Sequence, residues 1–212
     1  MLIEDNFYNI KQLILNISSK TKIIAVSKNQ DFSKISQLLK IGHTEFGENK
    51  LQEACLKWKN YIYKYPNVNL HFIGKLQSNK VKDIFSIFNY VHSLDSEKLA
   101  LLFSEIEKKN NKRLKYFIQV NIGEESQKSG IYIKDCKDFV LFCKKLNLNV
   151  QGLMCIPPFN KNPKDYFLKL KKLNNENNFT ELSMGMSDDF QIAAEMGSTY
   201  VRIGTAIFGK RN

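Results

Sequence analysis

Lys28 is the side chain of this sequence whose surroundings best suit covalent chemistry. It lies one serine beyond residues 23–26 (Ile-Ile-Ala-Val), a short β-branched run that is typical of a strand buried on both faces. A lysine held there near Lys80 or Arg202, and partly desolvated, would lose its proton more easily and could form an imine with an aldehyde. A solvated loop lysine is the alternative, because lysines are common in this sequence: of the 32 Lys and Arg residues only three are Arg.

Two glycine-containing segments near the C-terminus offer groups that could bind phosphate. Gly185 and Gly204 would let the backbone approach an anion closely, and Ser187 and Thr205 would add hydroxyl donors. Residues 205–208 can form a short helix whose N-terminus favours negative charge. Taken alone, this pattern is explained equally well by ordinary glycine turns capped by serine and threonine.

Strand and helix patterns alternate along the chain that carries these residues. Helically spaced apolar residues over 7–17 come first, and eight strands are predicted at residues 23–26, 45–46, 70–73, 90–92, 116–120, 150–154, 182–183 and 200–203. Strict alternation implies parallel strands with right-handed crossovers. We therefore predict one α/β domain, residues 1–212, folded as a (β/α)8 TIM-type barrel with an extra N-terminal helix. An open doubly wound sheet is the alternative.

In such a barrel, the C-terminal ends of the strands converge on one mouth, and the loops after strands seven and eight commonly bind phosphate. This arrangement would place Lys28 across the mouth from a phosphate cradle. An amine and a phosphate site at one mouth suggest pyridoxal 5'-phosphate (PLP), which carries an aldehyde and a phosphate on one ring.

Arg202 has a natural task in this arrangement. Its guanidinium could donate to the pyridine nitrogen of PLP, and as a permanent cation it would keep that nitrogen unprotonated. An unprotonated ring is a weaker electron sink than the pyridinium that a carboxylate partner would favour. An inward-facing salt bridge is the alternative role for Arg202.

Composition narrows the compartment and the partners. The net charge is +11, but the lysines are dispersed and arginine is scarce, so we expect no nucleic-acid partner. No run of residues is long and apolar enough for a membrane span, and the start lacks a signal-peptide pattern, which predicts a cytoplasmic protein. The cysteines and histidines show no metal-site spacing, so no metal is expected.

Seven segments follow one another along the chain in a specific order. They are residues 25–28 (Ala-Val-Ser-Lys), 46–49 (Phe-Gly-Glu-Asn), 71–80 (His-Phe-Ile-Gly-Lys-Leu-Gln-Ser-Asn-Lys), 118–121 (Ile-Gln-Val-Asn), 152–154 (Gly-Leu-Met), 182–187 (Leu-Ser-Met-Gly-Met-Ser) and 201–209 (Val-Arg-Ile-Gly-Thr-Ala-Ile-Phe-Gly). Together they resemble the pyridoxal phosphate homeostasis protein family, also called the PROSC or YggS family, which is related to the alanine racemase N-terminal barrel domain. The resemblance covers most of the chain.

The resemblance implies a role for each matching position. Lys28 would carry PLP covalently as an aldimine, and Arg202 would contact the pyridine nitrogen. The other cofactor-binding positions that it implies are Asn49, Ser183, Met184, Ser187, Gly204 and Thr205. Gln77, Asn79 and Lys80 match a family motif to which we assign no role.

The chain departs from the family beside two of these positions. Asp31 stands where the family often has proline, and Lys50 stands where an aromatic residue commonly follows Glu-Asn. We expect these differences to affect loop shape rather than the chemistry of Lys28.

Two functions compete on these residues, a carrier that buffers and delivers PLP and a racemase-like enzyme acting on amino acids. Racemisation on this barrel requires a second acid or base, which the racemase-like relatives take from an added β-domain. The single domain predicted over residues 1–212 does not include such a β-domain. We therefore predict a PLP carrier in PLP homeostasis, without efficient catalysis, that is monomeric and can serve apoenzymes accepting PLP. Nothing in the sequence favours a third reading, in which PLP merely stabilises a barrel that binds other macromolecules.

Overall fold

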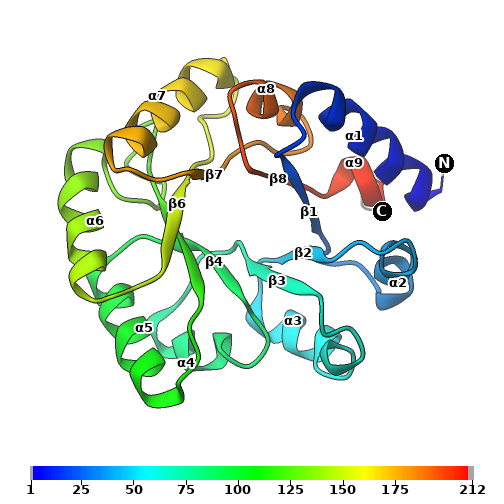
Figure 1. The fold of residues 1–212 in the computed structure, drawn as a ribbon, viewed down its shortest axis with the longest axis horizontal. Helices are drawn as coiled ribbons and strands as arrows, with labels where there is room; N and C mark the ends of the chain where they lie inside the picture. Colours follow the sequence, from blue (N-terminus) through cyan, green and yellow to red (C-terminus); the bar gives the residue numbers. More distant parts are fainter. Residues whose placement is uncertain (1, 210–212) are drawn as a thin grey trace.

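Eight parallel strands close into a barrel in the computed structural model, which describes residues 2–209 (Figure 1). The strands are β1 (Lys22–Val26), β2 (Glu45–Glu48), β3 (Asn69–Phe72), β4 (Tyr90–Leu94), β5 (Lys115–Gln119), β6 (Val150–Met154), β7 (Glu181–Ser183) and β8 (Tyr200–Ile203). Each strand pairs with the next in sequence, and β8 returns to β1 with Ile24 opposite Arg202. The predicted barrel and its eight strands are confirmed, and the open sheet is excluded.

Helices surround the barrel, as Figure 1 shows. They are α1 (Ile3–Ile17), α2 (Phe32–Lys40), α3 (Leu51–Trp58), α4 (Val81–Ile84), α5 (Glu97–Asn110), α6 (Cys136–Lys145), α7 (Pro163–Glu176), α8 (Phe190–Glu195) and α9 (Thr205–Phe208), with short 3-10 turns η1 (Ile62–Lys64), η2 (Ser78–Lys80) and η3 (Ile133–Asp135). No helix among residues 2–209 has the length and apolar character that crossing a bilayer would require.

The predicted N-terminal helix, α1, packs outside the barrel on the side where β8 pairs with β1. Phe7, Ile10 and Ile14 recur at helical spacing and are buried on one face. Asn6 Nδ2 donates to the Ile207 carbonyl at 3.0 Å, so α1 is tied directly to α9 (Figure 1). The helix therefore supports the short element that follows the last strand.

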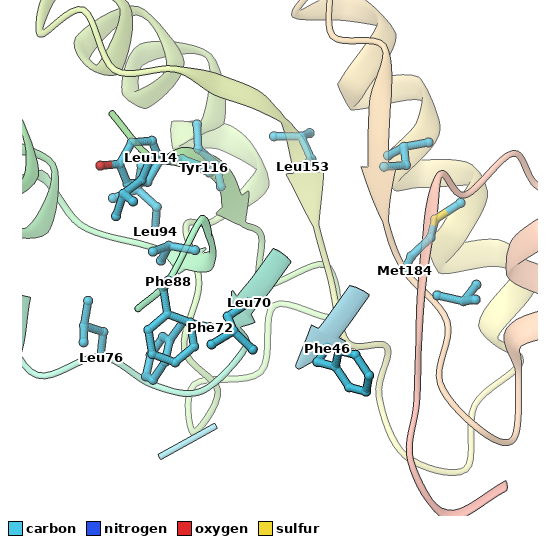
Figure 2. Packing of buried hydrophobic residues seen from close by; sticks show 14 of the residues in the cluster. Phe46, Leu70, Phe72, Leu76, Phe88, Leu94, Leu114, Tyr116, Leu153 and Met184 are labelled. Carbon is cyan, nitrogen blue, oxygen red and sulfur yellow. The ribbon is translucent and has the colours of Figure 1, made fainter. Parts of the chain in front are cut away.

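A large apolar cluster fills the space between the strands and the helices. Figure 2 shows part of it, in which Phe72 of β3 lies against Phe88 with ring centroids 5.3 Å apart. Burial of these rings removes a large apolar area from water and holds the helices on the outside of the barrel.

A second, smaller cluster lies inside the barrel. It consists of Ile24, Tyr90, Phe117, Met154 and Tyr200. Tyr200 of β8 contacts both Tyr90 of β4 and Phe117 of β5, with ring centroids 5.9 and 5.7 Å apart. Because β8 does not pair with β4 or β5, these contacts cross the barrel interior, which is packed with side chains and is not a pore.

Candidate cofactor-binding site

A cavity of about 310 Å³ opens at the C-terminal ends of the strands, a size that suits a small ligand. The loops after β1, β2, β3, β6, β7 and β8 contribute to its walls. Its lining residues are Val26, Lys28, Gln30, Asn49, Ile73, Gly74, Ile156, Met186, Ser187, Asp188, Arg202, Gly204, Thr205 and Gly209. The predicted convergence of Lys28, Arg202 and the last two loops on one opening is thus found in the structure.

A tight turn holds Lys28 at this cavity. The Gln30 N–H donates to the Ser27 carbonyl at 3.1 Å, and Asn29 adopts a left-handed conformation with φ 57°. Asparagine tolerates that conformation better than most residues, and its N–H donates to the Glu53 carboxylate. The turn leaves the Lys28 side chain half-buried in the cavity wall.

A buried ion pair supports the turn from below. Glu48 Oε1 accepts from Ser27 Oγ at 2.7 Å and from Trp58 Nε1 at 3.1 Å. Lys57 Nζ lies 3.0 Å from the same oxygen and also donates to the Ser27 carbonyl at 2.7 Å. The backbone immediately before Lys28 is therefore fixed by the end of β2 and by α3.

Asp31, the first departure from the family pattern, precedes α2 with a φ of −67°, a value that proline also adopts. The second departure, Lys50, is extended and exposed at the start of α3.

Arg202 lies at the bottom of the cavity and is almost completely buried. Its Nη1 donates to Ser183 Oγ at 2.6 Å, and its Nη2 donates to the Cys155 carbonyl at 2.9 Å. Burial lowers the pKa of this guanidinium, an effect opposed by Cys155 and Asp189. An arginine stays protonated even so. Within residues 2–209 its hydrogen-bond partners are neutral and it has no ion pair, so the salt-bridge alternative is not what the structure shows.

The loops after β7 and β8 meet through Ser187. Its Oγ accepts from the backbone N–H of Gly204 at 3.3 Å and of Ala206 at 3.4 Å, at the start of α9. These long hydrogen bonds are weak, and a ligand oxygen could take over the same donors. The predicted short helix over residues 205–208 is confirmed, and Thr205, its first residue, is exposed.

Gly185 has a packing role in addition to any role in anion binding. Its φ is 94°, and a Cβ added there would lie 2.4 Å from the Cβ of Ala193. The Gly185 carbonyl accepts from the backbone N–H of Arg202 at 2.9 Å. The turn at Gly185 therefore aligns the loop after β7 with β8.

Asn49 follows β2 and forms part of the cavity wall. Its side chain is half-buried and lines the cavity, and within residues 2–209 its buried Oδ1 has no hydrogen-bond partner. A buried amide oxygen without a partner is costly, so a ligand that hydrogen-bonds there would be favoured. Gly74 packs tightly behind Asn49, because an added Cβ would lie 2.0 Å from its carbonyl oxygen.

Ser183 and Met184 are the two expected site residues that do not line the cavity. Ser183 is fully buried beneath Arg202 and contacts it through the hydrogen bond described above. Met184 is buried in the cluster between strands and helices, and Figure 2 labels it among the residues of that cluster. The six other expected residues all line the cavity.

Sequence reasoning missed several contributors to this site. The Ala206 N–H has no side-chain signal, and Gln30 and Asp188 are ordinary polar residues in loops. Asp188 places a carboxylate beside the cationic groups and reduces the net positive charge of the cavity. Two further polar residues connect to Arg202 through Ser183 and were not assigned to the site. His92 had only the signal of a histidine within a predicted strand, and His71 in addition begins the matching segment 71–80.

Three comparisons relate the chain to known proteins. It matches the family of the alanine racemase N-terminal domain over residues 3–212. A protein of Vibrio cholerae called pyridoxal phosphate homeostasis protein is 40% identical over 208 residues, which cover 92% of this chain and 87% of the relative. A protein of Aquifex aeolicus with the same name is 39% identical over 203 residues, which cover 90% of this chain and 87% of the relative.

Solved structures show the same barrel. PipY of Synechococcus elongatus with PLP bound has a TM-score of 0.88 and 30% identity, covering 98% of this chain and 100% of that chain. An alanine racemase of Clostridium difficile has a TM-score of 0.78 at 16% identity, and the match covers 99% of this chain and 57% of that one. This second likeness shows the fold alone.

Proposed function

The chain belongs to the pyridoxal phosphate homeostasis protein family and to the wider alanine racemase N-terminal domain family, and we propose that it is a carrier of PLP. One observation carries the proposal: a single cavity brings together the amine of Lys28, the buried guanidinium of Arg202 and the backbone N–H groups at Ser187. The Synechococcus relative with PLP bound supports the same ligand.

Lys28 is the residue that we assign to covalent attachment. When bound, PLP supplies an aldehyde that condenses reversibly with a primary amine and releases water. Lys28 provides that amine from a turn fixed on both sides, by the Gln30 N–H and by the Glu48–Lys57 pair beneath it. A rigid backbone limits the positions that its flexible side chain can reach and so favours attachment at one place.

Arg202 and Asn49 would orient the ring. Arg202 has five N–H donors, of which two bond Ser183 and the Cys155 carbonyl within the described residues, so others can face the ligand. A guanidinium can only donate, so a ring nitrogen bonded to it stays unprotonated. Asn49, whose Oδ1 has no hydrogen-bond partner within residues 2–209, would accept from a polar substituent of the ring.

Ser187, Gly204 and Thr205 would hold the phosphate, together with the Ala206 N–H. A phosphate oxygen can accept from the N–H groups that now point at Ser187 Oγ, and the two hydroxyls can add donors. We assign Ser183 a role through Arg202, and Met184 a packing role behind the same wall.

We propose binding and delivery without efficient turnover. Among the described lining residues, Lys28, Asp188 and Arg202 are the side chains that can carry charge, and Asp188 is exposed. An exposed carboxylate is a poor second base for controlled proton transfer at neutral pH. The relatives named as homeostasis proteins support a carrier, whereas the racemase-like alternative has the support of fold likeness only.

The surroundings of this carrier are part of the proposal. We propose a cytoplasmic monomer whose partners are PLP and the apoenzymes that accept it. All four cysteines are unpaired thiols in the structure, a state that a reducing compartment maintains.

Attachment at Lys28 is tested by borohydride reduction. The protein is mixed with one equivalent of PLP, reduced, digested and mapped by mass spectrometry. We expect the label on the peptide that contains Lys28, its loss in Lys28→Ala, and its retention in Lys75→Ala, which removes an exposed lysine of the loop after β3. A label on another lysine, or none, would refute the site.

The carrier and racemase functions are separated by exchange of the amino-acid α-proton with solvent. We expect no exchange at rates typical of enzymes, together with transfer of PLP to an apoenzyme. Rapid exchange that Lys28→Ala abolishes would overturn the carrier proposal.

A further inference from the structure

Five polar side chains form one continuous hydrogen-bonded chain through the interior of the barrel. Glu45 Oε2 lies 2.7 Å from His71 Nε2, and His71 Nδ1 lies 2.9 Å from His92 Nε2. His92 Nδ1 lies 2.8 Å from Ser183 Oγ, which accepts from Arg202 Nη1 at 2.6 Å. This hydrogen-bonded chain starts at the N-terminal end of β2 and ends at the cavity, which lies at the C-terminal ends of the strands.

The middle of this chain is sealed from water. His71, His92 and Ser183 are fully buried. The ring of His71 stacks on Tyr90 with centroids 4.3 Å apart, and the ring of His92 stacks on Phe117 at 4.5 Å. In such apolar surroundings an unpaired polar group is costly, so each nitrogen needs the partner that the chain provides.

The link between His92 and Ser183 spans the barrel. His92 lies on β4 and Ser183 on β7, and these two strands do not pair in the sheet. A hydrogen bond between them therefore joins opposite walls through the interior. Apolar side chains could fill the same volume, but they would not tie the position of one wall to that of the other.

The two ends of the hydrogen-bonded chain fix the direction of its first and last hydrogen bonds. Arg202 can only donate, and Glu45 as a carboxylate can only accept. Burial alone would raise the pKa of Glu45, but hydrogen bonds from His71 and Asn69 hold it at about 2, so the group is ionised at neutral pH.

Both histidines are neutral in this arrangement, because burial lowers the pKa of His71 and of His92. His71 then donates from Nε2 to Glu45 and accepts at Nδ1 from His92 Nε2–H. His92 in turn accepts at Nδ1 from the Ser183 hydroxyl, whose oxygen receives the Arg202 N–H. All polar atoms of the chain between its ends are satisfied by this single pattern.

We propose that His71 and His92 are positioning residues that act through Ser183 to hold the Arg202 guanidinium in one orientation toward the ligand cavity. The inference deepens the proposed function and rests on it in one respect, that Arg202 faces the bound cofactor. Glu45 accepts the last hydrogen bond at the far end of the hydrogen-bonded chain. The orientation of Arg202 at the cavity therefore depends on the Glu45 carboxylate at the N-terminal end of the barrel.

The hydrogen-bond pattern is tested first on the protein without ligand. ¹⁵N NMR of the ring nitrogens should show His71 and His92 both neutral and both protonated at Nε2. Exchange of the Arg202 side-chain N–H groups with water should be about tenfold faster in Ser183→Ala, which loses one charge-assisted hydrogen bond of about 1.4 kcal/mol. Protonation of either histidine at Nδ1, or unchanged exchange in Ser183→Ala, would overturn the proposal.

The positioning role is tested by PLP titration. We expect Ser183→Ala and His92→Gln each to weaken PLP about tenfold, and the double variant to be no weaker than either single one, because both changes break the same link. His43→Phe is the matched control, since His43 is a histidine that bonds the Glu45 carbonyl outside the chain, and it should bind PLP normally. Additive losses, or an equal loss in His43→Phe, would overturn the proposal.

Failure of the proposed function has a different signature. A protein that does not bind PLP would refute the carrier. The NMR experiment would still decide whether the hydrogen-bonded chain from Glu45 to Arg202 exists. Ser183→Ala removes only one hydroxyl, so thermal unfolding of this variant shows whether any loss of binding reflects unfolding.

Discussion

The Arg202 guanidinium donates to the Ser183 hydroxyl at 2.6 Å, and its hydrogen-bond partners within the described chain are neutral. The cation that faces the cavity is therefore held by groups that leave its charge available to a ligand. This relationship between two residues of neighbouring strands makes Arg202 the first target for testing the site.

Arg202→Glu should change the absorption spectrum of bound PLP. A carboxylate at this position would favour a protonated ring nitrogen, whereas the guanidinium excludes one. Arg113→Glu is the control, because Arg113 is half-exposed and bonds the Asn147 carbonyl away from the cavity. Identical spectra for Arg202→Glu and the unmodified protein would contradict the nitrogen contact.

Ser187→Ala should weaken PLP about tenfold and leave pyridoxal, which lacks the phosphate, almost unaffected. The Ser187 hydroxyl lies between the Gly204 and Ala206 N–H groups, so its loss removes a donor at the place assigned to the phosphate. Absorbance titration with both ligands measures the difference. Ser126→Ala, at an exposed position, should change neither affinity. If both ligands lose affinity equally in Ser187→Ala, the phosphate does not bind there.

Lys57→Ala should lower the free energy of unfolding by about 3–5 kcal/mol, because it leaves the buried Glu48 carboxylate without its cation. The same change removes the hydrogen bond to the Ser27 carbonyl that supports the Lys28 turn. Urea denaturation measures the loss. The matched control is Lys172→Ala, whose exposed pair with Glu176 at 4.0 Å should contribute no more than about 0.5 kcal/mol. Equal effects of the two changes would rule out a structural role for the buried pair.

The free energy of unfolding should decrease as the pH falls below about 6.5. Burial lowers the pKa of His43 to about 4, so between these values the unfolded chain binds a proton that the folded chain does not. Glu45 extends the loss at lower pH, because its pKa of about 2 lies below the ordinary value of 4.5 and its protonation removes an interaction of the folded state.

His43→Phe separates the His43 contribution from the rest. Urea denaturation at about pH 7 and about pH 5 should show a smaller loss of stability in this variant than in the unmodified protein, since the unfolded chain then binds one proton fewer. The difference should be on the order of 1–2 kcal/mol. A loss of the same size in both proteins would show that His43 is not buried in its neutral form.

Hydrophobic periodicity determined the barrel. Each predicted strand is present because a short β-branched or aromatic run between helical stripes can be buried only as a strand of a covered parallel sheet. Boundaries shifted where polar residues continue a strand. β2 runs on to Glu48 and β4 to Leu94, because backbone pairing with a neighbouring strand does not depend on side-chain polarity.

The pleat of the strands explains which expected site residues line the cavity and which do not. Successive residues of a strand point to opposite faces, so Ser183 points into the barrel and Met184, next to it, points toward the helices. Lys28 and Arg202 could be assigned from their places at strand ends. The depth of Ser183 beneath Arg202 depends on the register between β7 and β8, which the sequence does not show.

The sequence by itself determined the order of the strands, the residues at their ends and the resemblance to a PLP-binding family, because these depend on local pattern. Only the tertiary structure decided that Glu45, His71, His92, Ser183 and Arg202 form one chain. His92 and Ser183 are 91 positions apart on strands that do not pair, and they meet because closure of the barrel turns both side chains toward the same interior.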